Sequence, residues 1–220
     1  MAEAPVDPAA AAVVFLALED FARQPVAAQV KLRERLEALL ARSIEPLAAE
    51  DRIVADTAEG AAVVVLGSPT DALMLARRAR RGAHDAAEPF GLRVGVNHGP
   101  VGVATDPAGE LVVVGDGVAT GASIAGFAQP GQVLASRAFR EALEAADPER
   151  AERLRPGGSF TDAALRAHEV FAFDPASDSA AADAAPAPGR RRALLIAGAA
   201  ALGLLGAGAV VRWLRTHRGA

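Results

Sequence analysis

The sequence predicts an α+β domain followed by a single membrane-spanning helix. Short apolar, valine-rich runs alternate through residues 11–173 with segments in which leucine and alanine recur at helical spacing. Residues 193–211 carry no charge. A Pro/Ala/Asp/Ser-rich stretch without apolar periodicity, 174–189, lies between these two parts. We therefore divide the chain into a domain (1–173), a linker that ends in arginines (174–192), a span (193–211) and a short basic tail (212–220).

The first half of the domain is expected to fold as a strand, a helix, a hairpin and a second helix. Residues 11–18 form an apolar run of strand length, and Pro46 should end the following leucine-periodic helix at about residue 45. The runs RIVADT and GAAVVVLG are separated by Ala58 and Glu59, which predicts a β-hairpin with Glu59 at its tip. Ser68, Pro69 and Asp71 form a capping pattern that opens a helix to about residue 86.

The second half is expected to add more strands and two helices. Residues 92–99 predict a strand that ends in glycine, and a short hairpin around TDPAGE follows it. The segment GDGVATGASIAGFA predicts a glycine-rich helix after a tight turn. A strand at 132–136, a helix at 137–146 and a strand at 168–173 close the domain. This order favours a mixed sheet with the helices packed on one face.

Composition and charge exclude several classes of function. The chain has no cysteine, so it contains neither disulfides nor thiolate metal sites. Lys31 is the only lysine. Residues 1–189 carry 17 basic and 27 acidic side chains, a formal charge of −10, whereas the remainder carries six arginines and no acid. Because nucleic-acid binding depends on neutralising phosphates with Lys and Arg, we expect no nucleic-acid partner.

The apolar segment 193–211 is predicted to anchor the chain in a membrane. As a helix it would be about 28 Å long, which matches the hydrocarbon thickness of a bilayer. Three arginines precede it, and Arg212, Trp213 and Arg215 follow it, as is typical of residues at the headgroup level. The N-terminus has no basic region before its apolar run, so it does not resemble a signal peptide. We expect a tail anchor that leaves the N-terminal domain in the cytoplasm.

Five stretches, in this order, resemble the class III nucleotide cyclase homology domain. They are VVFLALEDF, DTAEGAAVVVLGSPTDAL, LRVGVNHGPV, VVGDGVATGASIAGFA and QPGQVLASRAF, and the resemblance extends over about residues 12–173. The resemblance implies a ferredoxin-like sheet that dimerises head to tail and forms its active sites across the interface. A homodimer, or a pair with a related cyclase-domain chain, is therefore expected. It also implies attack of a ribose 3′-hydroxyl on the α-phosphate of ATP or GTP, assisted by two divalent ions such as Mg²⁺ or Mn²⁺.

The same resemblance places the family's two metal-binding carboxylates on Ala17 and Glu59. A methyl group cannot bind a metal ion. Glu59 is the remaining candidate metal ligand, and its alternative role is that of an exposed turn residue. Glu19 and Asp20 closely follow Ala17 and are the candidate replacements for the missing carboxylate.

The other catalytic groups of the family fall on small or apolar residues of this chain. The asparagine and the transition-state arginine correspond to Ala119 and Ser123. The purine-recognising lysine and its acidic partner correspond to Ala55 and Val112, and Lys31 lies elsewhere, on the first predicted helix.

Two polar residues near these positions are expected to have structural roles. Asp116 matches an aspartate in the family's GD turn, and we predict that its side chain caps the helix that starts beside it. His98 follows a predicted strand, and we expect it to be a turn or surface residue. The four histidines are scattered along the chain without metal-ligand spacing.

Three functional hypotheses follow from the sequence. The leading one is a catalytically degenerate, membrane-tethered domain that acts as a dimerisation or signalling module. The alternative is a divergent active cyclase whose metals are held by Glu59 together with Glu19 or Asp20. A heterodimer with a competent partner chain is the third, although the residues of both complementary half-sites are largely missing here.

Overall fold

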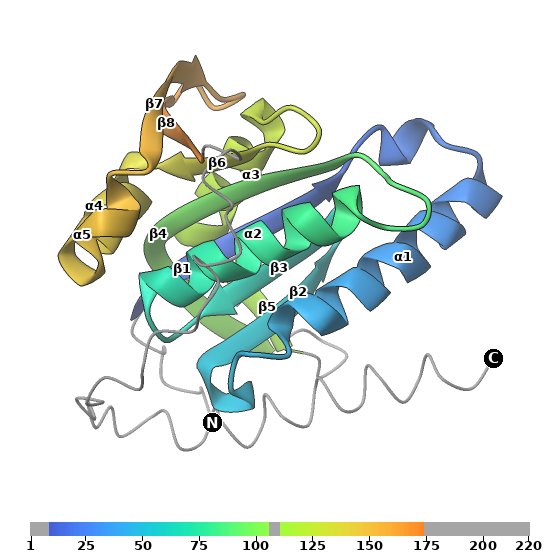
Figure 1. The fold of residues 1–220 in the computed structure, drawn as a ribbon, viewed down its shortest axis with the longest axis horizontal. Coiled ribbons are helices and arrows are strands. Elements are labelled where there is room, and N and C mark those ends of the chain that lie inside the picture. The colour runs from blue at the N-terminus through green and yellow to red at the C-terminus, as the bar shows by residue number, and fades with distance from the viewer. Residues whose placement is uncertain (1–8, 106–110, 174–220) are drawn as a thin grey trace.

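The computed structural model describes residues 9–105 and 111–173 (Figure 1). Within these ranges eight strands form one sheet in the order β2-β3-β1-β4-β6-β8-β7, with β5 paired to β4 outside this path. β4 and β6 pair in parallel, and the other neighbours pair antiparallel, so the predicted mixed α+β sheet is confirmed. The predicted linker and span, 174–211, lie outside the described residues.

The strands are β1 (Ala9–Leu18), β2 (Arg52–Thr57), β3 (Gly60–Val65), β4 (Leu92–Thr105), β5 (Leu111–Val114), β6 (Val133–Ser136), β7 (Leu154–Thr161) and β8 (Ala167–Phe173). The α-helices are α1 (Val26–Ile44), α2 (Pro69–His84), α3 (Asp116–Phe127), α4 (Arg137–Ala146) and α5 (Pro148–Ala151), and short 3-10 turns are η1 (Phe21–Arg23) and η2 (Ala49–Asp51). No helix within the two described ranges is long and apolar enough to cross a membrane.

Two strand predictions were wrong. β4 does not end at Gly99, because Gly99 and Pro100 continue the ladder with the start of β1 and the strand then runs on to pair with β5. β7 was missed altogether. Its Pro156, Gly157 and Gly158 are typical of a turn, but they lie on an edge strand, where an irregular register next to β8 accommodates them.

The helices do not pack on one face, as we expected, but on both. α1, α2 and α4 cover the face to which Val14 and Leu16 of β1 belong, in the largest apolar cluster. α3 lies on the opposite face, over Val13. Successive residues of a strand point to opposite faces, and β1 is apolar on both. A strand of this kind needs cover on each side.

α3 approaches the sheet closely because glycine lines the contact. A Cβ on Gly95 of β4 would lie 2.3 Å from the backbone N of Ala125 and 2.4 Å from the carbonyl O of Gly121. Only a residue without a side chain fits there. α3, on which the resemblance places two catalytic positions, is thus set directly against β1 and β4.

Candidate functional site

The end of β1 and the tip of the β2–β3 hairpin lie side by side. Ala17 pairs with Gly60 across the β1–β3 ladder, and the N–H of Leu18 donates to the carbonyl of Glu59 at 2.9 Å. The fold therefore brings together the two positions at which the resemblance expects metal-binding carboxylates. One of them is the buried methyl group of Ala17, and the other is the exposed Glu59.

The two candidate replacement acids face elsewhere. A carboxylate oxygen of Glu19 lies only 2.2 Å from where a Gly91 Cβ would be, so this side chain packs against the segment before β4. Asp20 adopts a left-handed conformation with φ 49°, and its carboxylate lies 3.3 Å from Nη1 of Arg23. The side chains of Glu19 and Asp20 thus each contact a neighbouring segment.

The two-metal site implied by the resemblance does not fit these side chains. Residues 9–105 and 111–173 contain no group of three or more His, Asp or Glu side chains that could hold a metal ion. Two metals in such a site need facing carboxylates on adjacent strands. Beside the hairpin tip the end of β1 offers only the methyl group of Ala17, so we derive no metal-dependent step.

An arginine that sequence reasoning missed holds the hairpin tip. Arg33 on α1 donates from Nη1 to the carbonyl of Gly60 at 2.7 Å, and from Nη2 to those of Thr57 and Ala58 at 2.9 and 3.1 Å. Its guanidinium also pairs with Asp56 at 2.6 Å. The tip is therefore ordered by a cation of this chain. Nothing in the helical pattern of α1 distinguishes Arg33 from its neighbouring charged residues.

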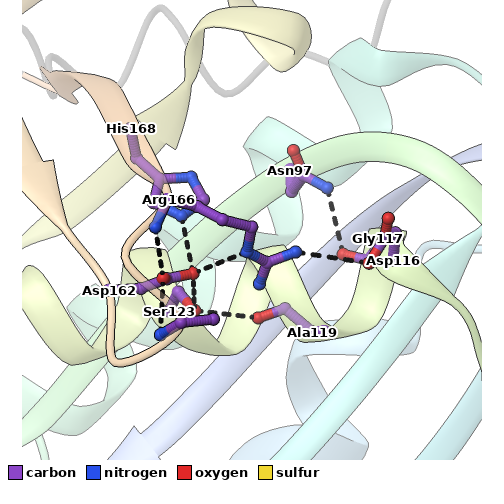
Figure 2. A network of polar contacts seen from close by, with 9 residues as sticks. Asn97, Asp116, Gly117, Ala119, Ser123, Asp162, Arg166 and His168 are labelled. Carbon is purple, nitrogen blue, oxygen red and sulfur yellow. Dashed lines mark hydrogen bonds and ion pairs between the residues drawn. The ribbon is translucent and has the colours of Figure 1, made fainter.

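On α3, Ser123 lies at the position where the resemblance expects an arginine, and it faces a carboxylate. Its hydroxyl donates to the carbonyl of Ala119 at 3.2 Å and lies 3.5 Å from Oδ2 of Asp162 (Figure 2). Asp162 belongs to the turn between β7 and β8. The position where the resemblance expects a cation thus lies beside an acid from a distant part of the chain.

Asp162 is the centre of the polar network in Figure 2. Its side chain is 5% exposed, and it accepts hydrogen bonds from the backbone N–H groups of Ala164 and Arg166 at 2.9 Å. Nε of Arg166 donates to Oδ2 at 2.9 Å, and Nε2 of His168 lies at the same distance from that oxygen. The hydrogen bond with His168, followed by those from Arg166, holds the pKa of Asp162 well below its usual range.

The network is not arranged for nucleophilic catalysis. Ser123 and His168 both contact Oδ2 of Asp162, so the carboxylate lies between the hydroxyl and the imidazole. A catalytic serine needs its base in direct hydrogen-bonding reach, with the acid behind the base. The arrangement instead fastens the β7–β8 turn to α3. Because Ser123 and Asp162 are 39 residues apart, no local sequence pattern could have revealed their contact.

The predicted cap of α3 is corrected by the structure. Gly115, with φ 119°, is the N-cap residue, and no side-chain capping bond is made. Its carbonyl accepts from the N–H groups of Val118 and Ala119 at 3.1 and 3.3 Å. Asp116 is the first helical residue, and its carboxylate lies 3.3 Å from Nη1 of Arg166. The left-handed conformation required at the cap favours glycine, which shifts the aspartate into the first turn.

The remaining sequence-predicted positions do not converge on a polar site. Ala55 lies on β2 opposite Ala62, and Val112 on β5 is 39% exposed beside the equally apolar Val114. Lys31 is exposed on α1. His98 is half-buried, and desolvation lowers its pKa.

A groove of about 570 Å³ lies between the N-termini of α3 and α4. Asn97 and His98 line it, but Asn97 is already satisfied, since it donates to the carbonyl of Gly117 at 3.0 Å and accepts from Ser136 at 2.7 Å. The groove is also lined by acidic side chains and by Arg137, which forms an ion pair with Glu169. This mixed lining selects no ligand class.

Comparison with known proteins identifies the fold. No family model and no curated protein sequence matches the chain. Among solved structures, the guanylate cyclase domain of RhGC from Catenaria anguillulae, in complex with GTP, superposes with a TM-score of 0.60 at 16% identity, covering 75% of this chain and 96% of that one. The adenylyl cyclase CyaB from P. aeruginosa superposes at 0.57 and 13% identity, covering 77% and 96%.

A third match is a dimeric guanylyl cyclase domain of the RhoGC fusion protein from the aquatic fungus Blastocladiella emersonii, with a TM-score of 0.58 and 13% identity over 78% of this chain and 98% of that one. All three are nucleotide cyclase domains. The predicted cyclase-homology fold is therefore confirmed.

Proposed function

Starting from the fold of class III adenylate and guanylate cyclase domains, we propose that this chain is a catalytically degenerate member that acts as a membrane-tethered dimerisation or signalling module. One observation carries the proposal. The backbone brings the end of β1 and the hairpin tip together as a metal site would need, yet Ala17 offers a methyl group there and the nearby acids Glu19 and Asp20 are held in other contacts.

The surroundings of Ser123 support the same proposal. Cyclase chemistry needs a cation where negative charge develops on the transferred phosphate. Here Arg166, the arginine of the network that contains Ser123, is bound by Asp162 and Asp116. A low-pKa carboxylate next to Ser123 disfavours a phosphate at this place.

The proposed partner is a second copy of this chain or a related cyclase-domain chain. Val112, Val114 and Ala119 are exposed on β5 and the start of α3. Contact through such side chains avoids the cost of desolvating charges. One structural match is a dimeric guanylyl cyclase domain. Confinement to a membrane would raise the effective concentration of two such domains for each other.

The proposed location rests on the sequence of 193–211. We expect the full chain to resist extraction from membranes by alkaline carbonate, and a chain that ends at Pro188 to be soluble. Carbonate-resistant membrane association of the shortened chain would show that another surface anchors the protein.

The decisive experiment is a cyclase assay on the full chain in detergent with ATP or GTP and Mn²⁺. We expect no cyclic nucleotide above background. Cyclic product that disappears in the Glu59→Ala variant would contradict the proposal and establish the alternative, a divergent active cyclase in which Glu59 is a metal ligand. The Asp71→Ala variant, which changes an acid on α2, is the matched control for that loss.

A further inference from the structure

The turn between β7 and β8 has an exposed apolar apex, which consists of Ala163, Ala164 and Leu165. Leu165, at 85%, is the most exposed of the large apolar side chains in the described ranges. It belongs to none of the apolar clusters that the described residues form. Figure 1 shows the β7–β8 hairpin at one edge of the domain. The leucine therefore has no apolar surroundings within the domain.

Leu165 also has an unfavourable backbone conformation. Its φ is 61°, and the other non-glycine residue with a positive φ in residues 9–105 and 111–173 is Asp20. Asn, Asp and Gly adopt this left-handed conformation readily, whereas the Cβ of a leucine crowds the following carbonyl oxygen. One residue thus combines two features that destabilise the isolated domain, and asparagine in its place would remove both. A contact outside the domain would give the leucine side chain a favourable role.

The base of the turn holds the apex in a fixed shape. The carboxylate of Asp162 accepts from the N–H groups of Ala164 and Arg166, both at 2.9 Å, and the N–H of Leu165 donates to the carbonyl of Asp162 at 3.0 Å. The charges of Asp162 and Arg166 at this base are paired with each other. Docking of the apex would therefore order few further groups and would not bury an unpaired charge of this turn.

We propose that the apex, residues 163–165, docks on the surface of the lipid bilayer that holds the chain. This inference rests on the proposed membrane location. Two alanines and a leucine at a convex apex, without a charged side chain among them, suit the boundary between headgroups and acyl chains. Residues 1–189 carry a formal charge of −10, so anionic lipids would not attract the domain. The docking is therefore apolar.

The length of the chain beyond the domain is compatible with this docking. β8 has seven residues, which places Phe173 about 20 Å from the turn. The predicted linker, residues 174–189, has an average reach of about 20–25 Å as a flexible chain. A bilayer at the level of the apex is therefore within reach of a tether that starts at the other end of β8.

A contact of this size is sufficient only because the chain is anchored. Burial of one leucine side chain favours the docked state by about tenfold to a hundredfold. That is too little to bring a free domain from solution to a membrane, but a short tether supplies an effective concentration in the millimolar range. Because Arg166 contacts Asp116, docking would also hold the start of α3 near the bilayer. Two anchored copies would then present the proposed dimer surface at the same level.

The absence of native cysteines permits a site-specific test on the full chain. A nitroxide label is attached at Ala164→Cys or at Ala87→Cys, and each protein is reconstituted at one chain per phosphatidylcholine nanodisc. Ala87 is exposed between α2 and β4, at the end of the sheet opposite to the turn. EPR measures collisions of each label with oxygen, which concentrates in lipid, and with a water-soluble nickel chelate. With a docked-to-free ratio of about ten, the label at 164 should be about tenfold less accessible to nickel than the label at 87, and more accessible to oxygen.

Leu165→Asn is the critical variant, because asparagine tolerates the left-handed backbone and removes the apolar side chain. The variant should be at least as stable as wild type in urea denaturation, so that lost docking cannot be due to unfolding. Its docked-to-free ratio should fall about tenfold, which raises the nickel accessibility at 164 about fivefold. Val26→Asn removes another exposed apolar side chain, on α1, and is the matched control that should leave both accessibilities unchanged.

Three results would contradict the proposal in different ways. Equal nickel accessibility at 164 and 87 in an inserted chain would refute docking and leave the membrane location intact. A chain that does not enter nanodiscs would refute the location and, with it, the docking. Low accessibility to both nickel and oxygen at 164 would show burial in protein, and its restriction to nanodiscs with two chains would assign the apex to a second copy.

Discussion

The two faces of the sheet are built on different principles. The face under α1, α2 and α4 is filled by bulky side chains, among them the fully buried Leu16, Leu73 and Phe139. The face under α3 depends on close approach through Gly95 and Gly121 and carries the polar network around Asp162 (Figure 2).

Four of the five positions at which the resemblance places catalytic groups on small or apolar residues belong to the α3 side. Ala17 alternates with Val14 and Leu16 and so shares the face of Val13. Ala55 lies opposite Ala62, on the same face as Val64. Ala119 and Ser123 lie on α3 itself. Val112 on β5 is the exception, because it alternates with Val113, which packs against the cluster of Val13 and Val64. The contrast teaches that bulky side chains on one face stabilise the fold, whereas the other face brings most of these positions to one side of the sheet.

The largest expected effect on the free energy of unfolding tests whether the two faces of the sheet differ in their contribution to stability. Phe139→Ala removes a fully buried ring from the bulky face and should lower the free energy of unfolding by about 3–5 kcal/mol. Ala119→Asn, an exposed change on α3 toward the family's residue, should alter it by less than about 0.5 kcal/mol. Urea denaturation followed by circular dichroism measures both. Comparable losses in the two variants would show that the faces are not distinct.

The second prediction concerns the backbone contact under α3. Gly95→Ala places a methyl group against the backbone of α3, which must move, so we expect a loss of about 1–3 kcal/mol. Gly126→Ala is the control, because a Cβ there meets no atom within 4 Å. Its helix propensity should leave stability equal or higher by less than about 1 kcal/mol. If Gly95→Ala were neutral in the same denaturation experiment, the close approach of α3 would not constrain the fold.

The third prediction tests whether α3 forms part of the proposed dimer surface. Ala119→Arg places a charge on the proposed dimer surface and should weaken self-association about tenfold, equivalent to about 1.4 kcal/mol. Light scattering against concentration, on the full chain in detergent and on the chain that ends at Pro188, provides the measurement. Lys31→Arg on α1, an exposed change that keeps the charge, should leave association unaffected. A dimer that tolerates Ala119→Arg would place the interface elsewhere.

The smallest effect on stability is expected when the network around Asp162 loses its carboxylate charge. Its folded-state pKa lies below the ordinary value of 3.8, so the ionised carboxylate stabilises the fold. That contribution is complete above about pH 4 and is lost as the pH falls toward the folded-state pKa. Asp162→Asn should therefore be less stable than wild type at pH 6, and the two denaturation curves should converge at low pH.

Asp116→Asn is the matched control for this pH dependence. The Asp116 carboxylate is 76% exposed and makes one contact, with Arg166. Its removal should not change the acid limb of the stability curve. A constant difference between Asp162→Asn and wild type from pH 6 to pH 2 would mean that the carboxylate charge does not fasten the β7–β8 turn.

The sequence by itself determined the local elements. The helix expected near 137–146 is α4, and the hairpin turns at Ala58 and Glu59, as the two strand-like runs on either side indicate. The cyclase-like order of motifs likewise brought Ala17 and Glu59 to adjacent positions. These features depend on periodicity, capping and turn residues within a few positions of one another, all of which a sequence displays.

Only the tertiary structure decided which groups meet. β7 is a strand because it pairs with β8, although its Pro and Gly residues are typical of a turn. The second face of the sheet is covered because α3 packs over β1. Arg33 reaches a turn 24 residues away, Asp162 meets Ser123 over 39, and Arg166 meets Asp116 over 50. Contacts over such separations leave no periodic signal, because each is fixed by the packing of whole elements and not by neighbouring residues along the chain.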